Sequence, residues 1–375
     1  MTQELGIALI GSGYMGKAHA LAYHTMKPVF GDTPDVRLEV LCDTPEDRAN
    51  AMAEQFGFAR ATTDYREAVA DPRVDVVSIA TPNKLHKEMV LAAAAAGKHV
   101  WVEKPLGITL EEGREMVAAV AAAGVQSMVG YNYVRNPAFQ HARKLIANGA
   151  IGRIIHFRGV FEEDYSADPD LPWSWRSLTS EAGLGALGDM ACHLISLTYE
   201  LVGPIDSLVA DMQTVYETRP MPDGSGRGPV ENEDIASALV RFANGAHGVL
   251  MSSRVAWGRK NKIAFEVHGD KGMICFDQER LNELQIYRNA GRRAEQGFAT
   301  ILTGPEHPPY GHFIPGPGHS LGFTDLKTIE AAEFLRTIAY GTLSGPDIKQ
   351  AFEYERVIFA IAEAAATQQR VSLTP

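Results

Sequence analysis

The sequence predicts an α/β fold with two domains: a doubly wound parallel sheet, then an α+β domain with a large, mainly antiparallel sheet. Two observations support this prediction. Up to about residue 130, short apolar strands alternate with helical patterns, as expected for a parallel sheet with helices on both faces. Beyond that point strand patterns dominate, and tight turns such as Asn244-Gly245 join them, which is typical of antiparallel hairpins.

The first half of the chain alternates between the two kinds of element. Its strand patterns are continuous apolar runs, which predicts burial on both faces of the sheet. The strands are expected at residues 5–11, 37–43, 74–82, 99–105 and 127–131, and the helices at residues 17–24, 45–56, 85–96 and 110–123. We therefore assign the first domain to residues 1–132.

The second half is richer in strands than in helices. Strands are expected at residues 154–163, 207–217, 236–257, 262–278 and 281–289, and helices at residues 137–148, 185–202, 325–340 and 348–367. We assign residues 133–375 to an α+β domain for substrate binding and oligomerisation. Its C-terminal helices are able to pack back on the first domain.

The composition excludes several kinds of partner and site. With 375 residues, 45% of them hydrophobic and 22% charged, the chain is an ordinary globular protein. Its net charge of −11 argues against nucleic acid or an anionic membrane as partner, because their phosphates would be repelled. The cysteines Cys42, Cys192 and Cys275 form no CxxC pair, which fits a reducing cytoplasm better than a disulfide framework or a thiolate zinc site. Because the N-terminus lacks a signal-peptide pattern, we expect a cytoplasmic protein.

A glycine-rich turn follows the first expected strand and opens the first expected helix. In this spacing the first glycine permits a tight turn, the second lets the backbone approach a pyrophosphate, and the third lets helix and strand pack closely. Free N–H groups at the helix start then bind the phosphates. The motif predicts a Rossmann dinucleotide-binding site formed by Gly11, Gly13, Tyr14, Met15 and Gly16.

The second expected strand ends in Asp43, a residue that distinguishes the two nicotinamide cofactors. A carboxylate at this strand end accepts hydrogen bonds from the adenosine ribose and repels a 2′-phosphate. Asp43 lies 27 positions after Gly16, beyond the usual gap of ~20, and a loop at residues 28–34 accounts for the excess. Arg48 is close enough to stack on adenine. We expect NAD as the cofactor; the alternative for Asp43 is a solvated carboxylate at a strand end.

Four motifs occur in order along the chain. They are the glycine turn Gly11–Gly16, Thr81-Pro82-Asn83 with His86, Glu103-Lys104-Pro105, and Gly185-x-Leu-x-Asp189-x-x-x-His193. Together they resemble the glucose–fructose oxidoreductase/inositol dehydrogenase/rhizopine-catabolism (Gfo/Idh/MocA) family over essentially the whole chain, and within it the scyllo-inositol, myo-inositol and L-glucose dehydrogenases. The resemblance implies an NAD-dependent dehydrogenase that oxidises a secondary hydroxyl of a cyclic polyol or sugar to the ketone or lactone. The cofactor contacts that it implies include Thr81, Pro82, Asn83, His86, Glu103 and Lys104.

The resemblance assigns Lys104, Asp189 and His193 as the catalytic residues, and the chemistry of each side chain fits. Lys104 ends the fourth parallel strand, at the sheet edge where ligands bind, and a partly desolvated lysine beside a nicotinamide cation has a lowered pKa. Asp189 and His193 are four residues apart on a helix and therefore share a face. Histidine titrates near neutral pH and suits the general base that the reaction needs. His193 is favoured over Lys104 as the proton acceptor, although this choice stays open, as do a surface role for Lys104 and a structural role for the Asp–His pair.

Further residues are expected to contact the cofactor or the substrate. Asn132 follows the last parallel strand, where it faces the nicotinamide or the substrate. In family members, a Trp-Arg pair at the place of Trp175-Arg176 lies beside both ligands; the alternative is a packing tryptophan with a surface arginine. Weaker substrate candidates are Tyr165, Asp164 and Asp168.

Residues 303–323 form the most unusual segment, with His307, His312 and His319 among several prolines. The histidine spacings of five and seven fall on no helix face, so we expect no metal. A long loop without regular structure is usually functional or disordered. We expect this one to cover a polar pocket, of its own or of a neighbouring subunit, with His319 and then His312 as substrate ligands. A plain solvent loop is the alternative.

The resemblance also implies a homo-oligomer and leaves competing functions. In family members two antiparallel sheets pack face to face into dimers, which often pair into tetramers. Two other functions occur on this fold: NAD-retaining cleavage of glycosidic bonds, and non-catalytic sensing of a sugar or NAD. An intact set of Lys104, Asp189 and His193 argues against a sensor. The sequence leaves open which polyol or sugar is used, which carbon is oxidised and in which direction the reaction runs.

Overall fold

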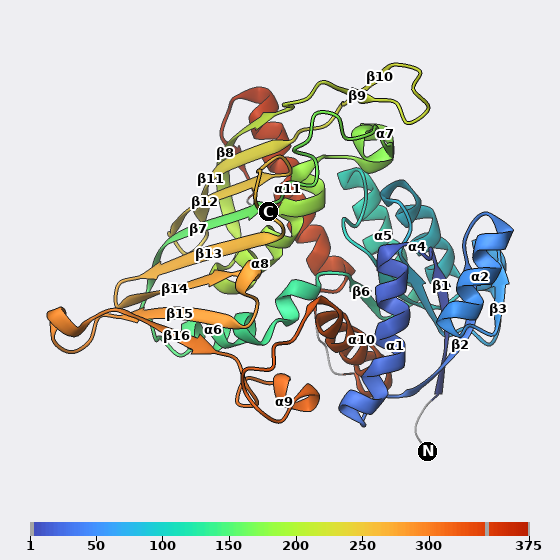
Figure 1. The fold of residues 1–375 in the computed structure, drawn as a ribbon, viewed down its shortest axis with the longest axis horizontal. Coiled ribbons are helices and arrows are strands. Elements are labelled where there is room, and N and C mark those ends of the chain that lie inside the picture. Colours follow the sequence, from blue (N-terminus) through green and yellow to red (C-terminus); the bar gives the residue numbers. More distant parts are fainter. Residues whose placement is uncertain (1–3, 342–344, 374–375) are drawn as a thin grey trace. The chain divides into compact units, whose positions relative to one another are not determined.

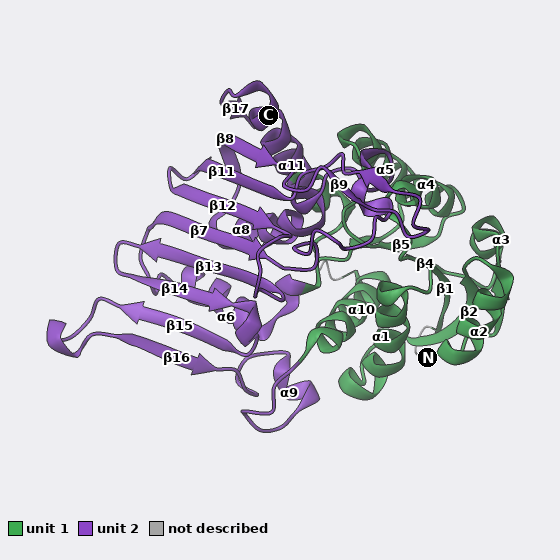
Figure 2. Cartoon of the chain, turned by 45° about the horizontal axis from the view of Figure 1, so that its top comes forward, with its two compact units in different colours: residues 1–132, 322–353 green, residues 133–321, 354–375 purple. Residues whose placement is uncertain are grey.

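The computed structural model describes residues 4–341 and 345–373 and divides into two compact units. The first unit comprises Met1–Asn132 and Gly322–Glu353, and the second comprises Tyr133–Leu321 and Tyr354–Pro375 (Figure 2). Helix α11 (Ile348–Thr367) begins in the first unit and ends in the second.

The first unit contains a six-stranded, wholly parallel sheet in the order β3-β2-β1-β4-β5-β6, of which β1, β2, β3 and β6 are labelled in Figure 1. This order confirms the doubly wound Rossmann sheet. It reverses between β1 and β4, and ligands of such sheets bind outside the carboxyl ends of the strands at that point. The strands are β1 (Glu4–Ile10), β2 (Asp35–Cys42), β3 (Arg60–Thr62), β4 (Val76–Ile79), β5 (His99–Val102) and β6 (Ser127–Val129).

Helices cover this sheet, and its central strand is apolar throughout. Every residue of β1 after Glu4 is buried, as expected for a strand covered on both faces. Helix α5 illustrates how the sequence sets helix ends: the Thr109 hydroxyl accepts a hydrogen bond from the Glu112 N–H at its start, and Gly124 ends it in the left-handed conformation. Helix α10 packs on α1. The helices are α1 (Tyr14–Phe30), α2 (Glu46–Phe56), α3 (Tyr65–Ala70), α4 (His86–Ala95), α5 (Leu110–Ala123) and α10 (Phe323–Tyr340).

Three details of this unit differ from the sequence prediction. Strand β3 and helix α3 were not expected, because at three and six residues they are too short to show an apolar period. Helix α1 is longer than expected and reaches Phe30, so Pro28 lies inside the helix instead of in a loop.

The second unit is built on a nine-stranded sheet in the order β16-β15-β14-β13-β7-β12-β11-β8-β17. Among the described strands of this sheet only β7 and β12 pair in parallel, which confirms the large, mainly antiparallel sheet. The strands are β7 (Ile154–Glu162), β8 (Ile205–Gln213), β11 (Ile235–Phe242), β12 (His247–Ser253), β13 (Lys262–Gly269), β14 (Gly272–Asp277), β15 (Glu283–Arg288), β16 (Phe298–Leu302) and β17 (Val371–Ser372). Strands β9 (Thr218–Pro220) and β10 (Arg227–Pro229) form a separate hairpin.

Helices cover one face of the large sheet. Along β7 the side chains of Phe157 and Phe161 are buried, whereas Arg158 between them is exposed, which is the period-two pattern of a half-buried strand. Helix α8 (Cys192–Val202) contacts β7, and helix α6 (Pro137–Ala147) contacts β14 and β15. Within the described residues, no helix combines the length and apolarity that a membrane crossing requires.

Candidate active site

The glycine turn between β1 and α1 has the geometry that its motif predicts. Gly11 adopts a φ of 93°, a conformation that favours glycine. A Cβ atom on Gly16 would lie 2.0 Å from the Gly11 carbonyl oxygen, so only glycine lets the helix start this close to the strand end. At Gly13, by contrast, a Cβ atom would meet nothing within 4 Å. The backbone there is open to a ligand, and the turn fits a pyrophosphate at the N-terminus of α1.

Asn132, shortly after β6, offers a second indication of a ligand. Its side chain is buried, at 2% exposure, and within the described part of the chain its amide nitrogen has no hydrogen-bond partner. Buried polar groups are nearly always hydrogen-bonded. This orphaned donor therefore fits the predicted contact with a nicotinamide cofactor or a substrate.

Asp43, directly after β2, is bonded to the glycine turn. Its Oδ2 accepts hydrogen bonds from the Ser12 N–H, at 2.8 Å, and from the Ser12 hydroxyl. Burial alone would raise the pKa of Asp43, but the hydrogen bonds from Ser12 and Thr44 and the charge of Arg48 outweigh it and lower the pKa. Arg48 Nε lies 3.2 Å from Oδ2, and half of the Arg48 side chain is exposed. An ionised carboxylate thus lies beside the turn, as NAD selection requires.

His86 is buried inside the first unit and joins two turns. Its ring nitrogens lie 3.0 Å from the Thr81 carbonyl oxygen and 2.9 Å from the Pro105 carbonyl oxygen. It therefore connects the Thr81-Pro82-Asn83 turn after β4 to the turn after β5, where the Lys104-Pro105 peptide is cis. Burial lowers the pKa of His86 below its usual value. The contact of His86 and the Thr81 turn with the cofactor stays a prediction. In the structure, His86 connects the segments that follow β4 and β5.

Glu103 and Lys104 directly follow β5 and lie in different environments. Lys104 is half-buried, whereas Glu103 is 4% exposed. Glu103 Oε1 lies 2.8 Å from His19 Nε2 and 2.5 Å from Lys327 Nζ, and Lys327 also pairs with Glu330 at 2.7 Å. Burial opposes ionisation of Glu103, but the charge of Lys327 and the hydrogen bond from His19 hold its pKa well below the usual range. This buried cluster fixes the strand end that carries Lys104.

In the second unit, the segment that carries Asp189 begins as a π-helix, η4 (Leu187–Ala191), and continues as α8. The sequence predicted an ordinary α-helix here. π-Helices are rare and occur frequently at functional sites. The Asp189 carboxylate accepts a hydrogen bond from the Tyr165 hydroxyl at 3.1 Å, so two of the predicted site residues meet. Desolvation, and then the charge of Asp189, raise the pKa of Tyr165 well above its usual value.

His193 lies at the start of α8 and is 5% exposed. Its ring centroid is 4.6 Å from that of Tyr133 and 6.1 Å from that of Phe161. The Tyr133 hydroxyl in turn accepts a hydrogen bond from Asn261 Nδ2 at 3.0 Å. Aromatic neighbours thus restrict the orientation of the imidazole, as a positioned acid–base group requires.

Trp175 and Arg176 form a stacked pair in the second unit. The Arg176 guanidinium carbon lies 4.5 Å from the centroid of the Trp175 ring, a cation–π geometry. Arg176 is exposed, while its backbone carbonyl accepts a hydrogen bond from Asn232 Nδ2 at 2.8 Å. The pair is therefore anchored by its backbone and presents a cationic side chain, and its contact with a ligand stays a prediction.

The predicted loop after residue 303 is more regular than its sequence indicates. It contains helix α9 (Tyr310–Phe313), in which Tyr310 is fully buried. Asn282 ties the two ends of the loop: its carbonyl accepts the Thr303 N–H at 2.9 Å, and its side chain bonds the Leu321 N–H and carbonyl at 2.9 Å each. His312 and His319 are exposed on this closed loop. Across residues 4–341 and 345–373, no group of three or more His, Cys, Asp or Glu side chains is arranged to hold a metal ion.

Sequence reasoning missed the buried polar residues that support these sites. Asn232, Glu233 and Asp234 directly precede β11 and are 3%, 4% and 0% exposed. Three polar residues that lead into an alternating apolar strand were the available signal, but it does not reveal which segments they bind. Lys327 was missed because it lies far along the chain from Glu103, on an otherwise ordinary helix.

Comparison with known proteins identifies the family. Residues 5–131 match the model of the oxidoreductase family with an NAD-binding Rossmann fold, and residues 139–275 match the GFO/IDH/MocA C-terminal domain. Levoglucosan dehydrogenase from Pseudarthrobacter phenanthrenivorans is 41% identical over 99% of this chain and 98% of its own. A solved structure of levoglucosan dehydrogenase in complex with NADH and levoglucosan matches with a TM-score of 0.96 at 42% identity, over 100% of both chains. The NAD(+)-dependent scyllo-inositol 2-dehydrogenase of Bacillus subtilis is 30% identical over 78% of this chain and 79% of its own.

These matches agree with the motifs and with the open glycine turn beside Asp43. The chain belongs to the Gfo/Idh/MocA family and is an NAD-dependent oxidoreductase that acts on CH–OH groups.

Proposed function

We propose that this enzyme oxidises a secondary hydroxyl of a cyclic sugar to the ketone, and that an anhydrosugar of the levoglucosan type is its substrate. The observation that carries the proposal is the similarity to levoglucosan dehydrogenase, at 41% identity over 99% of the chain. The inositol dehydrogenases among the relatives are 29–30% identical over 77–78% of the chain. This difference favours an anhydrosugar over the inositols and L-glucose that the sequence motifs suggested.

The reaction needs a proton acceptor and groups that orient the reacting hydroxyl. The oxygen loses a proton, and the carbon loses a hydrogen together with its electron pair. NAD+, when bound, supplies the acceptor for this hydride. We assign His193 as the proton acceptor and Lys104 as the donor of a hydrogen bond to the reacting oxygen. The aromatic contacts of His193 and the half-buried position of Lys104 support these roles.

Asp189 takes an orienting role in this proposal. The Tyr165 phenol is protonated at neutral pH and donates a hydrogen bond to the Asp189 carboxylate at 3.1 Å. A carboxylate held in this way accepts a hydrogen bond from a neighbouring sugar hydroxyl or stabilises the imidazolium of His193 after proton transfer. Asn132 and Arg176 supply further donors: an orphaned buried amide and an exposed guanidinium with an anchored backbone.

A screen for NADH formation tests the substrate. Initial rates are measured with NAD+ and levoglucosan, scyllo-inositol, myo-inositol, D-glucose or L-glucose. We expect kcat/KM for levoglucosan to exceed the others by about tenfold or more, equivalent to ~1.4 kcal/mol of transition-state binding. If an inositol gave the highest kcat/KM, the anhydrosugar assignment would be wrong while the enzyme class would stand.

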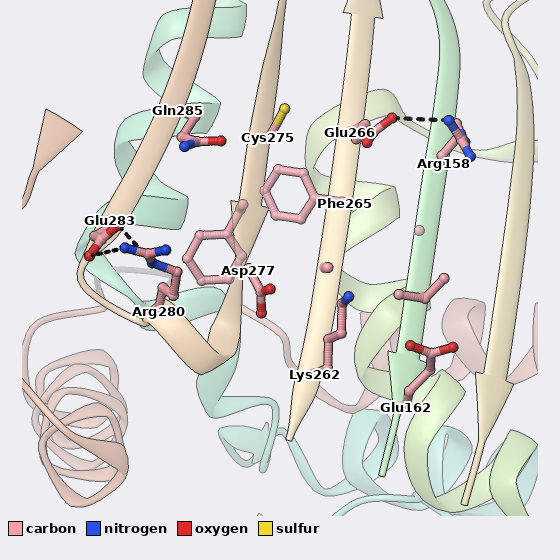
Figure 3. Close-up of a pocket in the computed structure, with 14 residues that line it drawn as sticks. Arg158, Glu162, Lys262, Phe265, Glu266, Cys275, Asp277, Arg280, Glu283 and Gln285 are labelled. Carbon is pink, nitrogen blue, oxygen red and sulfur yellow. Dashed lines mark hydrogen bonds and ion pairs between the residues drawn. The ribbon is translucent and has the colours of Figure 1, made fainter. Parts of the chain in front are cut away.

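We also propose that the enzyme is a homo-oligomer in which the outward face of the nine-stranded sheet binds a second copy. A hollow of about 520 Å³ on this face is lined by charged side chains of both signs (Figure 3). Arg158 Nη1 of β7 lies 3.4 Å from Glu266 Oε2 of β13 in this hollow. Leu239 of β11 is 58% exposed. A face with both charges and exposed apolar side chains suits the self-complementary contact of a two-fold dimer.

Light scattering tests this proposal by the mass of the particle. We expect a dimer or tetramer for the native chain and a smaller particle for Leu239→Glu, which places a charge in the interface. A monomeric native chain would contradict the proposal.

A further inference from the structure

Three consecutive residues, Asn232, Glu233 and Asp234, are here called the NED triplet. They directly precede β11 and are almost completely buried, with exposed fractions of 3%, 4% and 0%. Burying polar and charged side chains costs free energy unless each one is hydrogen-bonded. Each member of the triplet is hydrogen-bonded within the second unit, and Asn232 and Asp234 share Arg254 as a partner.

Glu233 satisfies the start of the helix that carries Asp189. Its carboxylate accepts hydrogen bonds from the N–H groups of Leu187, at 2.7 Å, and Gly185, at 3.0 Å. Its backbone carbonyl accepts the N–H of Ala186 at 2.9 Å. The first N–H groups of a helix have no partner within it, and here one residue satisfies three in a row. A Cβ atom on Gly185 would lie 2.0 Å from the Glu233 carbonyl oxygen, so this close approach requires glycine.

Asn232 bonds the segment that carries Trp175 and Arg176. Its Nδ2 donates to the Arg176 carbonyl oxygen at 2.8 Å and lies 3.4 Å from the Gly183 carbonyl oxygen. Its Oδ1 accepts a hydrogen bond from Arg254 Nη2 at 2.9 Å. The amide therefore uses both of its ends, one on the Trp-Arg segment and one on a buried arginine.

Asp234 bonds the segment that carries Tyr165, through Arg254. Its Oδ1 accepts a hydrogen bond from Arg254 Nε at 2.7 Å, and the Arg254 carbonyl accepts the N–H of Ser166 at 3.0 Å. A second buried arginine, Arg219, donates to the Ser166 carbonyl at 2.6 Å. The N–H and the carbonyl of Ser166, the residue that follows Tyr165, are therefore both hydrogen-bonded.

We propose that the NED triplet is a positioning device that holds the segments of Asp189, Arg176 and Tyr165 in their working arrangement. The proposal rests on the roles proposed above for those three residues. The triplet does not touch the reacting atoms; it acts through the backbone segments that it bonds. Glu233 affects turnover because it anchors the helix of Asp189 and His193, whereas Asn232 affects sugar binding because it anchors Arg176.

Stability alone is a weaker explanation for this arrangement. Asp234 forms an ion pair with Arg254 at 2.7 Å, and Arg254 is 4% exposed. Buried ion networks of this kind contribute little net stability compared with apolar packing. They do impose specific hydrogen-bond geometry, and a misplacement of about 1 Å at a catalytic group can cost roughly 100-fold in rate.

Two substitutions and one matched control test the proposal. Glu233→Gln keeps the shape but replaces an acceptor oxygen by an N–H₂ group that opposes the helix N–H groups. Asn232→Ser removes the donor to the Arg176 carbonyl. The control is Glu231→Gln. Glu231 is exposed, and among the described residues only Thr179, at the start of the short helix α7 (Thr179–Ala182), donates hydrogen bonds to its carboxylate.

The expected pattern is a split between kcat and KM. Glu233→Gln lowers kcat by about 10- to 100-fold with KM for the sugar and the NADH dissociation constant nearly unchanged. Asn232→Ser raises KM for the sugar by about tenfold with kcat nearly unchanged. In hydrogen exchange, the amides of residues 185–187 exchange about tenfold faster in Glu233→Gln but not in Glu231→Gln.

Two results would overturn the proposal. One is a Glu233→Gln variant with native kcat and native amide protection. The other is a loss of kcat in both variants that matches their loss of folded protein, with KM unchanged. If Glu233→Gln fails to fold, the KM of Asn232→Ser decides. If the native enzyme oxidises none of the sugars, the proposed substrate fails, while the exchange comparison still decides whether Glu233 anchors the helix.

Discussion

The two units hold their site residues by different means. In the first unit the glycine turn, Asp43 and Lys104 all follow strands of one parallel sheet, so a rule of topology places them together at its carboxyl edge. In the second unit Tyr165 lies in a turn, Arg176 on the short 3-10 helix η3 (Trp175–Ser177) and Asp189 on the π-helix η4, and single buried side chains fix them. Glu233 reaches back 46 and 48 positions to do so. A regular sheet positions a site by strand order, whereas an irregular site depends on individual buried hydrogen bonds.

The largest expected effect tests whether both units contribute to the reaction. Lys104→Met in the first unit and His193→Ala in the second should each lower kcat by roughly 10²–10⁴-fold, the usual loss of a positioned acid–base group. NADH should still quench the protein fluorescence normally. Lys349→Met, at an exposed lysine of the first unit, serves as control. A variant that keeps more than about a tenth of native turnover removes its residue from the catalytic set.

The second prediction asks whether the first unit also depends on a buried polar cluster. Burial lowers the pKa of His19 from 6.5 to about 4, against its hydrogen bond to Glu103 and with help from the charge of Lys327. Between pH 6.5 and about pH 4, His19 therefore binds a proton in the unfolded chain but not in the folded chain. The free energy of unfolding therefore falls as the pH falls from 6.5 to 4, by about 3 kcal/mol.

His19→Gln keeps a side-chain N–H for Glu103 and removes this titration. Urea unfolding is compared at pH 6.5 and pH 4.5, where the native chain should lose about 2–3 kcal/mol more than the variant. An equal loss in both chains would show that His19 is not the titrating group.

The third prediction concerns the cofactor. Replacing Asp43 with Ser and Thr44 with Arg should narrow or reverse the preference for NAD+ over NADP+, because the carboxylate that repels a 2′-phosphate is exchanged for a cation. We expect the ratio of the two kcat/KM values to change by about tenfold or more. Asp47→Ser, at an exposed aspartate of α2, should leave the ratio unchanged. A native enzyme that used both cofactors equally would contradict the placement of Asp43.

The smallest expected effect concerns the loop that Asn282 closes. His319→Ala should raise KM for the sugar by about tenfold, the ~1–2 kcal/mol of one lost hydrogen bond, with KM for NAD+ nearly unchanged. His312→Ala is the second choice. Unaltered KM and kcat for the sugar in both variants would show that the loop does not contact the substrate, either in its own subunit or in a neighbouring one.

The sequence predicts the first unit better than the second, and the same comparison explains why. Apolar runs and the glycine turn can each be recognised in a short stretch of sequence. The parallel sheet, the Gly11–Gly16 geometry and NAD binding therefore follow from the sequence. The pairing of buried polar groups has no local signature. The sequence therefore does not predict that Glu103 meets His19 and Lys327, that Glu233 holds the Asp189 helix, or that Asn282 closes a loop. The π-helix η4 at Asp189 was not predicted either.

The most direct test of hydride transfer follows a labelled hydrogen. Levoglucosan deuterated at its ring carbons is incubated with NAD+ and the enzyme, and the NADH is analysed by mass spectrometry. A dehydrogenase should place one deuterium in each NADH molecule and form one equivalent of keto sugar. Consumption of the sugar without accumulation of NADH would contradict the proposed function and indicate bond cleavage with a retained cofactor.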